Sequence, residues 1–231
     1  MNINEIGEFG FIEQLKKRYV PWDKSIIKGI GDDTGVFERD ENSVMLITTD
    51  MLIEDIHFRL KDISAYDLGF KSLAVNLSDI AAMGGIPQTA CVSLGIPENI
   101  SYELLMNFYE GMEPLLEEFS VMLIGGDTNR SPEGFVINVV VTGIIKKDEI
   151  IYRSGARAGD IIMTTGYLGD SSCGLDILFG KVDVEESYKN YFYNAHVKPR
   201  PHILEGRLLA ESGCVSALID ISDGLASDLK H

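Results

Sequence analysis

The amino-acid sequence predicts an α/β protein of two domains, and three observations lead to this prediction. Apolar runs rich in Val and Ile alternate along the chain with segments that have helical apolar spacing. A turn-rich connector at residues 154–160 separates a longer first part from a shorter second part, so we expect domains at 1–147 and 148–231. The content of 45% hydrophobic and 24% charged residues is ordinary for a globular protein.

The first part is predicted to contain three helices and four strands. Helical apolar spacing and a basic last turn indicate a helix at residues 8–19, and Gly84-Gly85 ends a long helix that begins at Ala65. Ser101 is the expected N-cap of the third helix. The helices are expected at 8–19, 65–83 and 101–119, and the strands at 44–49, 89–96, 121–124 and 135–146.

The second part continues the alternation over a shorter length. We expect strands at 161–165 and 217–219, and helices at 171–179, 202–211 and 223–230, with a polar stretch rich in Lys, Glu and Tyr between the first two helices. The sequence stops inside the last predicted helix. The second domain is therefore expected to be incomplete at its C-terminus.

Composition excludes several classes of function. The formal net charge is −16 and no basic run is present, so we expect neither nucleic acid nor an anionic membrane as a partner. Three widely spaced cysteines without a CxxC pair fit a reducing cytoplasm. The N-terminus lacks the apolar core of a signal peptide, and no run of 18 apolar residues is present.

Several aspartates follow apolar runs that have the character of strands. Asp50 and Asp127 end two such runs, and Asp220 ends a third that leads into Asp223. Asp33 lies in a glycine-rich loop. Because α/β sheets bind ligands at the carboxyl ends of their strands, these carboxylates are candidate ligands. For any single aspartate, the alternative is an N-cap or a turn.

Asp79 is the most informative single residue, because the segment around it is otherwise core. A carboxylate is almost never fully buried unless it is paired or bound to a metal. The alternative is an aspartate on the solvent face of an amphipathic helix. Oxygen ligands with few histidines favour Mg²⁺, Mn²⁺ or Ca²⁺ over zinc, and Thr48 and Thr49 could add oxygen ligands beside Asp50.

The common nucleotide-binding motifs are absent from the sequence: there is no GxxxxGK[ST] and no HRD or DFG set. Gly125-Gly126 would allow the backbone to approach a phosphate closely, or could simply form a tight turn. Arg153 and Arg157 are candidate phosphate clamps, although each alone is more often a surface residue.

The candidate segments together resemble the thiamine-monophosphate kinase family, within the superfamily of aminoimidazole ribonucleotide synthetase and selenophosphate synthetase. The segments that carry the resemblance are Gly29-Ile-Gly-Asp-Asp33, Thr48-Thr-Asp-Met-Leu52 with His57-Phe58, Lys71 to Gly84 (KSLAVNLSDIAAMG), Gly125-Gly-Asp-Thr-Asn-Arg130, Arg153-Ser-Gly-Ala-Arg-Ala-Gly-Asp160, Gly166-Tyr-Leu-Gly-Asp170 and Ile219-Asp-Ile-Ser-Asp-Gly-Leu225. They follow one another in family order along essentially the whole chain.

The resemblance implies a two-domain PurM-like fold, with an N-terminal mixed-sheet α/β domain that forms a homodimer and a C-terminal α/β domain. It also implies transfer of the ATP γ-phosphate to thiamine monophosphate, with several Mg²⁺ ions. By position, the implied metal ligands are Asp33, Thr48, Thr49, Asp50, Asp79, Asp127, Asp220 and Asp223. The implied ATP contacts are Tyr109, Gly126, Asp127, Arg153 and Ser222, and His57 is the implied contact for the thiamine phosphate.

Three functional hypotheses remain open at this point. The first is direct in-line transfer between two phosphates, which needs positioning and metal ions but no catalytic side chain, because the acceptor is already a phosphate oxygen. The second is another ATP-dependent phosphotransferase or synthetase of the same superfamily. The third is a non-catalytic protein that binds divalent metal.

Overall fold

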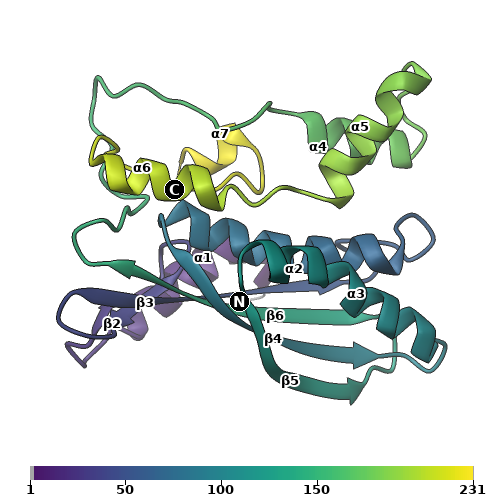
Figure 1. Ribbon diagram of the computed structural model, residues 1–231, viewed down its shortest axis with the longest axis horizontal. Coiled ribbons are helices and arrows are strands. Elements are labelled where there is room, and N and C mark those ends of the chain that lie inside the picture. The colour runs from purple at the N-terminus through teal and green to yellow at the C-terminus, as the bar shows by residue number, and fades with distance from the viewer. Residues whose placement is uncertain (1–2, 231) are drawn as a thin grey trace.

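A computed structural model of the protein describes residues 3–230. Its single sheet has six strands in the order β1-β2-β3-β6-β4-β5, and helices α2 and α3 cover one face (Figure 1). Helices α4 to α7 form a further layer on the far side of α2 (Figure 1). The mixed α/β fold predicted from the sequence is confirmed, although His231, the last residue of the predicted second domain, lies outside the described residues.

The strands run antiparallel to their neighbours except for one parallel pair. They are β1 (Ile26–Lys28), β2 (Gly35–Glu38), β3 (Ser43–Ile53), β4 (Ile86–Ile96), β5 (Met122–Arg130) and β6 (Val136–Lys146). The parallel pair is β4 and β5. Parallel neighbours need a crossover connection, and α3 provides it. The central pair, β3 and β6, stays in register from Ser43 opposite Lys146 to Ile53 opposite Val136.

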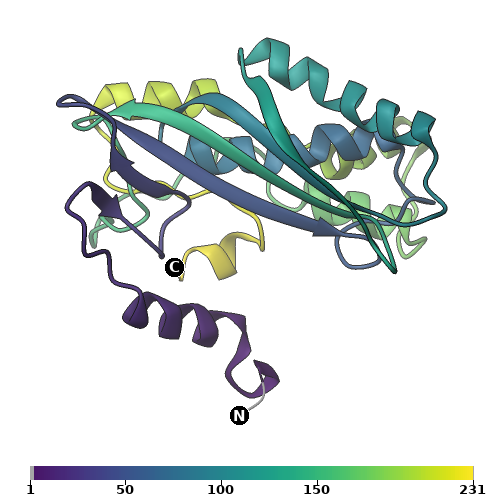
Figure 2. The same ribbon diagram turned by 90° about the horizontal axis from the view of Figure 1, so that it is seen from below.

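Seven helices lie within the described residues, and serine side chains cap the N-termini of α2 and α3. The helices are α1 (Ile3–Arg18), α2 (Ala65–Ala82), α3 (Tyr102–Glu118), α4 (Asp170–Leu178), α5 (Glu186–Val197), α6 (Ile203–Ser212) and α7 (Leu225–Asp228). The Ser64 and Ser101 hydroxyls accept hydrogen bonds from first-turn N–H groups of α2 and α3, at 3.0 and 3.2 Å. Helix α1 projects away from the sheet (Figure 2). Within residues 3–230, no helix combines the length and apolarity needed to cross a bilayer.

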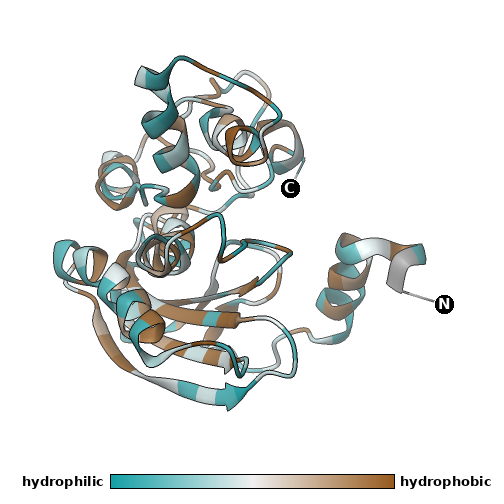
Figure 3. Cartoon of the chain, turned by 90° about the vertical axis from the view of Figure 1, so that its right-hand side faces the viewer, coloured by the Kyte–Doolittle hydropathy of each residue, from teal (hydrophilic) through white to brown (hydrophobic). Residues whose placement is uncertain are grey.

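The hydrophobic core lies between the sheet and α2. Residues of β3 and β6 alternate between buried and less buried positions, so one face of the sheet is apolar and packed. Leu46, Val139 and Val141 on that face belong to the same buried cluster as Leu73 and Leu77 of α2. No helix of the described chain covers the opposite face (Figure 3). We call that opposite face the outer face of the sheet.

Two of the predicted strands are wrong. Residues 161–165 and 217–219 pair with no strand in the described part of the chain. Their apolar residues suggested strands, but a strand needs a neighbour for its backbone hydrogen bonds, and Ile161 and Met163 are 87% and 85% exposed. The polar stretch after α4 instead contains α5, whose helix the sequence analysis did not predict.

The predicted strand ends at Asp50 and Asp127 are also wrong. Strand β3 continues to Ile53 and β5 continues to Arg130, so both aspartates lie inside strands. In the sequence, each apolar run stops at the first charged residue, and this pattern predicted the earlier strand ends. A charged residue fits within a strand where its side chain faces solvent or a polar site. The carboxylates therefore do not meet as a row of strand ends, which is the arrangement that the sequence predicted.

Candidate metal and phosphate site

Three carboxylates from distant parts of the chain meet beside the C-terminal part of α2. Asp33 lies in the turn between β1 and β2, Asp79 lies on α2, and Asp220 lies in the segment between α6 and α7. One carboxylate oxygen from each lies within 4.8 Å of the others. We call these three residues the carboxylate cluster.

Asp33 is held by an arginine on one side only. Its side chain is 2% exposed, and the Arg153 Nη2 donates to its Oδ1. The other oxygen, Oδ2, is buried without a hydrogen-bond partner among the described residues. Burial raises the pKa of Asp33 to about 7, although the Arg153 charge opposes that rise. An unsatisfied buried oxygen of this kind is suited to a cation.

Asp79 is in a still less favourable position for a carboxylate. The Thr48 hydroxyl donates to Asp79 Oδ2, and Thr48 itself is buried on the inner side of β3. Burial raises the pKa of Asp79 to about 9, and the charges of Asp50 and Asp220 add to the rise. Burial and the Asp220 charge also raise the pKa of Asp50. When they are charged, these carboxylates therefore repel one another unless a cation lies between them.

Asp220 bonds to α2, and Asp228 bonds to the loop that follows Asp220. The Ser78 hydroxyl donates to Asp220 Oδ2 at 3.0 Å, and burial raises the pKa of Asp220. In the loop, the N–H groups of Ser222 and Gly224 each donate to Asp228 Oδ2 at 3.1 Å. Asp223 is exposed, and its charge adds to the rise in the pKa of Asp220.

Asp32 was considered together with Asp33 as a candidate carboxylate, whereas three further residues that support the cluster were not predicted from the sequence: Asn76, Ser78 and Asp228. Asp32, whose side chain is fully buried, accepts from the Arg153 backbone N–H at 3.2 Å and lies 3.1 Å from Lys28 Nζ. The Asn76 Oδ1 accepts from the Asp50 N–H at 3.1 Å. Polarity was the sequence feature that could have identified these residues, because each is polar and lies within or next to a segment that contains candidate ligands.

His57 lies at the border between the cluster and a smaller cavity. Its Nδ1 accepts from the Ile53 N–H at 3.0 Å, so Nε2 carries the hydrogen of the neutral ring and is free to donate. Protonation of this ring would lower the pKa of Asp50. His57 also lines a cavity of about 170 Å³ between the turn after β3, α2, α4 and α5.

The remaining predicted site residues do not join the cluster within this chain. Thr49 and Asp127 both lie on the outer face, because Thr49 Oγ1 donates to Asn138 Oδ1 at 3.1 Å and Asp127 pairs in register with Ser93. Gly126 approaches β4 so closely that a Cβ would lie 1.7 Å from the Val92 carbonyl oxygen. It therefore belongs to a strand, and the tight turn considered for it is wrong.

Tyr109 is also separate from the cluster. It lies on α3 and its ring packs edge to face on Phe108, with centroids 5.5 Å apart. Burial raises the pKa of Tyr109. Among the described contacts, none joins its hydroxyl to a residue of the cluster.

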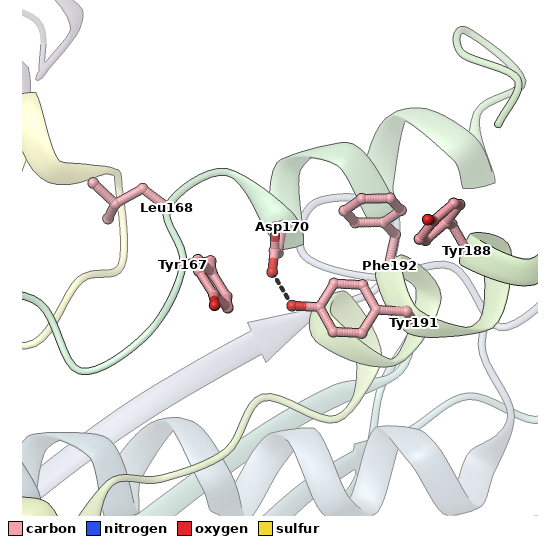
Figure 4. Close-up of a pocket in the computed structure, with 6 residues that line it drawn as sticks. All are labelled: Tyr167, Leu168, Asp170, Tyr188, Tyr191 and Phe192. Carbon is pink, nitrogen blue, oxygen red and sulfur yellow. Dashed lines mark hydrogen bonds between the residues drawn. The ribbon is translucent and has the colours of Figure 1, made fainter.

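A larger, open hollow of about 610 Å³ lies elsewhere, between the segment before α4 and helix α5 (Figure 4). Aromatic side chains line it, and the Tyr191 hydroxyl donates to Asp170 across it (Figure 4). None of the predicted metal, ATP or substrate residues lines this hollow. Size alone therefore does not locate the chemistry of this protein.

The fold and the carboxylate cluster define an α/β protein with a candidate site for metal and phosphate. Comparison with known proteins identifies the family. Residues 31–145 match the family described as AIR synthase related protein, N-terminal domain. The chain is 40% identical over 225 residues to the thiamine-monophosphate kinase of Buchnera aphidicola subsp. Acyrthosiphon pisum (strain APS), and the match covers 97% of this chain and 68% of that protein.

Further relatives agree with this match. Over 228 residues, the chain is 38% identical to the thiamine-monophosphate kinase of Bacillus subtilis (strain 168), covering 98% of this chain and 70% of the relative. A solved structure of AaThiL complexed with AMPPCP and TMP superposes with a TM-score of 0.87 at 33% identity, covering 98% of this chain and 69% of that chain. The chain belongs to the thiamine-monophosphate kinase family.

Proposed function

We propose that this protein transfers the γ-phosphate of ATP to the phosphate of thiamine monophosphate, which gives thiamine diphosphate. The observation that carries the proposal is the meeting of Asp33, Asp79 and Asp220 within 4.8 Å, in a site made of oxygen donors. Family membership supports the choice of substrates, because the relatives are thiamine-monophosphate kinases and the AaThiL structure contains AMPPCP and TMP.

The carboxylate cluster fits Mg²⁺. Its donors are oxygens, and Asp33 Oδ2 has no hydrogen-bond partner among the described residues. Burial, with repulsion from neighbouring carboxylates, raises the pKa of each member. The residues that would hold magnesium from this side of the sheet are Asp33, Thr48, Asp50, Asp79, Asp220 and Asp223. Bound Mg²⁺ would supply neutralisation and orientation of the phosphate charges.

The side chains of this chain perform the positioning. Thr48 and Ser78 orient Asp79 and Asp220 through their hydroxyl hydrogen bonds. The His57 Nε2–H is available to the acceptor phosphate, whose second pKa near 6 leaves it ionised at neutral pH without a general base. Arg153 can transfer its donors from Asp33 to a phosphate oxygen once the charge of that carboxylate is neutralised.

Nucleotide contacts are proposed at Tyr109, Gly126, Asp127, Arg153 and Ser222, as the family resemblance implies. The proposed domains, 1–147 and 148–231, both contribute to the cluster, since Asp33 and Asp79 come from the first and Asp220 from the second. We also propose a cytoplasmic location, in keeping with three free cysteines in the described chain.

We infer a homodimer that forms through the outer face of the sheet. Ile47 and Met51 of β3 are 41% and 51% exposed there, and edge strand β5 has Met122 63% exposed. Thr49 and Asp127 lie on the same face, opposite to the cluster. A second copy placed against this face could bring Asp127 of one subunit toward the ligand set of the other.

Incubation of the protein with ATP, Mg²⁺ and thiamine monophosphate tests the proposal. We expect ADP and thiamine diphosphate in equal amounts, and little ADP when thiamine monophosphate is left out. Turnover of ATP without thiamine diphosphate would overturn the proposal in favour of another phosphotransferase. Binding of Mg²⁺ with no turnover under any of these conditions would favour a non-catalytic metal-binding protein.

A further inference from the structure

Helix α6 crosses the C-terminal end of α2 at a close contact that contains one poorly exposed arginine. A Cβ on Gly206 of α6 would lie 2.3 Å from the Ala81 carbonyl oxygen of α2, so the two backbones touch at this point. Arg207 follows Gly206, and its side chain is only 14% exposed. The crossing lies next to the part of α2 that carries Ser78 and Asp79.

The Arg207 guanidinium group joins three segments of the chain. Its Nη1 donates to the Gly84 carbonyl oxygen, just after α2, at 2.7 Å. Its Nη2 donates at 2.8 Å to Glu149, in the segment after β6, and at 2.8 Å to Glu211 of α6. A planar guanidinium group directs several donors at fixed angles, so it can hold these acceptors at the same time, which an ammonium group does less firmly.

Each of these three segments carries or leads to a residue of the metal and phosphate site. Helix α2 carries Asp79. The segment with Glu149 leads to Arg153, whose side chain donates to Asp33. The segment after α6 leads to Asp220. The guanidinium group therefore fixes the relative positions of the segments that meet at the carboxylate cluster.

Further hydrogen bonds transmit this alignment from α6 to Asp220. The Leu218 N–H donates to the Tyr152 carbonyl oxygen at 3.2 Å, and the Ser216 hydroxyl donates to Asp160 Oδ2 at 2.6 Å. Both acceptors lie in the segment that follows β6. The segments after β6 and after α6 therefore run together between the arginine and the cluster, and a shift of α6 on α2 moves both.

We propose, on the basis of the proposed function, that Arg207 is a positioning residue for the metal site. By fixing α6 against α2, it holds Asp220 at the distance from Asp33 and Asp79 that shared metal ions require. Its donors are directed to other protein groups, so it acts through the placement of Asp220 and not by contact with a ligand. Mg²⁺ tolerates little departure from octahedral geometry, so a small shift of one carboxylate weakens the site.

Calorimetric titration of AMPPCP into the protein, in Mg²⁺ and in EDTA, tests this role through the gain in affinity that Mg²⁺ provides. The variants are Arg207→Met, which removes the donors and keeps an unbranched side chain, and Glu149→Gln, which removes the charge of one partner. The control is Lys198→Met. Lys198 also joins the C-terminal part of the chain to α2, at 2.7 Å from Asp67, but at the N-terminal end of that helix.

We expect Arg207→Met to reduce the Mg²⁺ gain by a factor of about 3 to 30 without changing the affinity in EDTA. Glu149→Gln should reduce the gain in the same direction by a smaller factor, and Lys198→Met should leave it unchanged. Urea unfolding of the same variants measures the stability that each loses, which separates an effect on metal binding from a general loosening of the fold.

A Mg²⁺ gain within about twofold of the wild-type value in both Arg207→Met and Glu149→Gln would overturn the inference. So would an equal loss of the gain in Lys198→Met, since any weakened contact with α2 would then have the same effect. If Arg207→Met does not fold, Glu149→Gln decides by the same criterion. These results would leave the proposed function standing, whereas a wild-type protein without any Mg²⁺ gain would contradict the proposed function and this inference with it.

Discussion

The charged form of the Asp79 carboxyl group is unfavourable in the folded protein unless a ligand binds to it. It lies on a helix that otherwise packs in the core, near Asp50 and Asp220, and its hydrogen bond comes from Thr48. The charged form therefore loses solvation and is repelled by its neighbours. A cation would remove both penalties, so metal binding and stability should be linked at this residue.

Replacement of Asp79 by Asn should make the metal-free protein no less stable, and more stable at alkaline pH. The folded pKa of about 9 is raised above the ordinary 3.8, so the folded protein retains a proton that the unfolded chain releases. Stability from this group is present below pH 3.8 and is lost as the pH rises through about 9. Urea unfolding in EDTA between about pH 5 and pH 9 should show a smaller decline for Asp79→Asn than for the wild-type protein.

Asp148→Asn is the matched control, because Asp148 is exposed in the turn after β6 and is not one of the proposed ligands. It should follow the wild-type pH dependence in EDTA, within the about ±0.5 kcal/mol of an ordinary surface change. A parallel decline of the wild-type protein and Asp79→Asn would show that Asp79 is not the strained group described here.

Single residues could be predicted from the sequence only where their type was unusual for its surroundings. Asp79 stood out because a carboxylate interrupts an apolar segment. Asn76 and Ser78 did not stand out, because their importance comes from partners far away in the sequence, Asp50 and Asp220. Such pairings depend on tertiary packing, which local pattern does not report.

At the scale of secondary-structure elements, glycines determine how closely the helices pack. A Cβ on Gly69 of α2 would lie 1.8 Å from the Phe108 carbonyl oxygen, and one on Gly111 of α3 would lie 1.9 Å from that of Tyr66. Helices α2 and α3 thus touch backbone to backbone at these points. The contact keeps α2, and with it Asp79, fixed on the sheet.

Gly111→Ala should destabilise the protein by about 1–3 kcal/mol or more, because the added methyl group forces α2 and α3 apart. Gly10→Ala is the control, since a Cβ there meets only the Ile6 Cβ at 3.5 Å within α1. That change should be neutral or stabilising, as alanine is preferred to glycine inside a helix. Chemical denaturation measures both, and equal effects at the two sites would contradict the proposed close crossing.

Helices were predicted well where the local sequence contains both an N-cap residue and an apolar face. Helices α2 and α3 have serine N-caps and apolar faces, and both begin within a residue of the prediction. The strands predicted at 161–165 and 217–219 failed because a strand depends on a neighbour that no local pattern specifies. The short strands β1 and β2 were missed for the same reason, since their stability comes from pairing with β3.

At the scale of the whole molecule, the proposed ligands fall on two faces of one sheet. The cluster lies on the inner face, and Asp127 lies on the outer face of β5. A single chain therefore does not assemble the full predicted ligand set. If the proposed homodimer forms through the outer face, each site would combine residues of two subunits.

Mixing two inactive variants tests this arrangement. Asp79→Asn and Asp127→Asn should each abolish most turnover as homodimers, because loss of a ligand removes charge stabilisation worth several kcal/mol. After subunit exchange, mixed dimers should contain one intact site, which restores about a quarter of the wild-type activity. Light scattering should show a dimer throughout. A monomer, or no recovery after proven exchange, would contradict shared sites.

The central claim, that the carboxylate cluster holds metal ions for a polyphosphate, is tested most directly by titrating AMPPCP into the protein with Mg²⁺ and with EDTA. The net charge of −16 and the cluster itself should repel a metal-free nucleotide. We predict binding at least about tenfold tighter in Mg²⁺, and loss of most of that gain in Asp33→Asn. Equal affinity in Mg²⁺ and EDTA would contradict the claim.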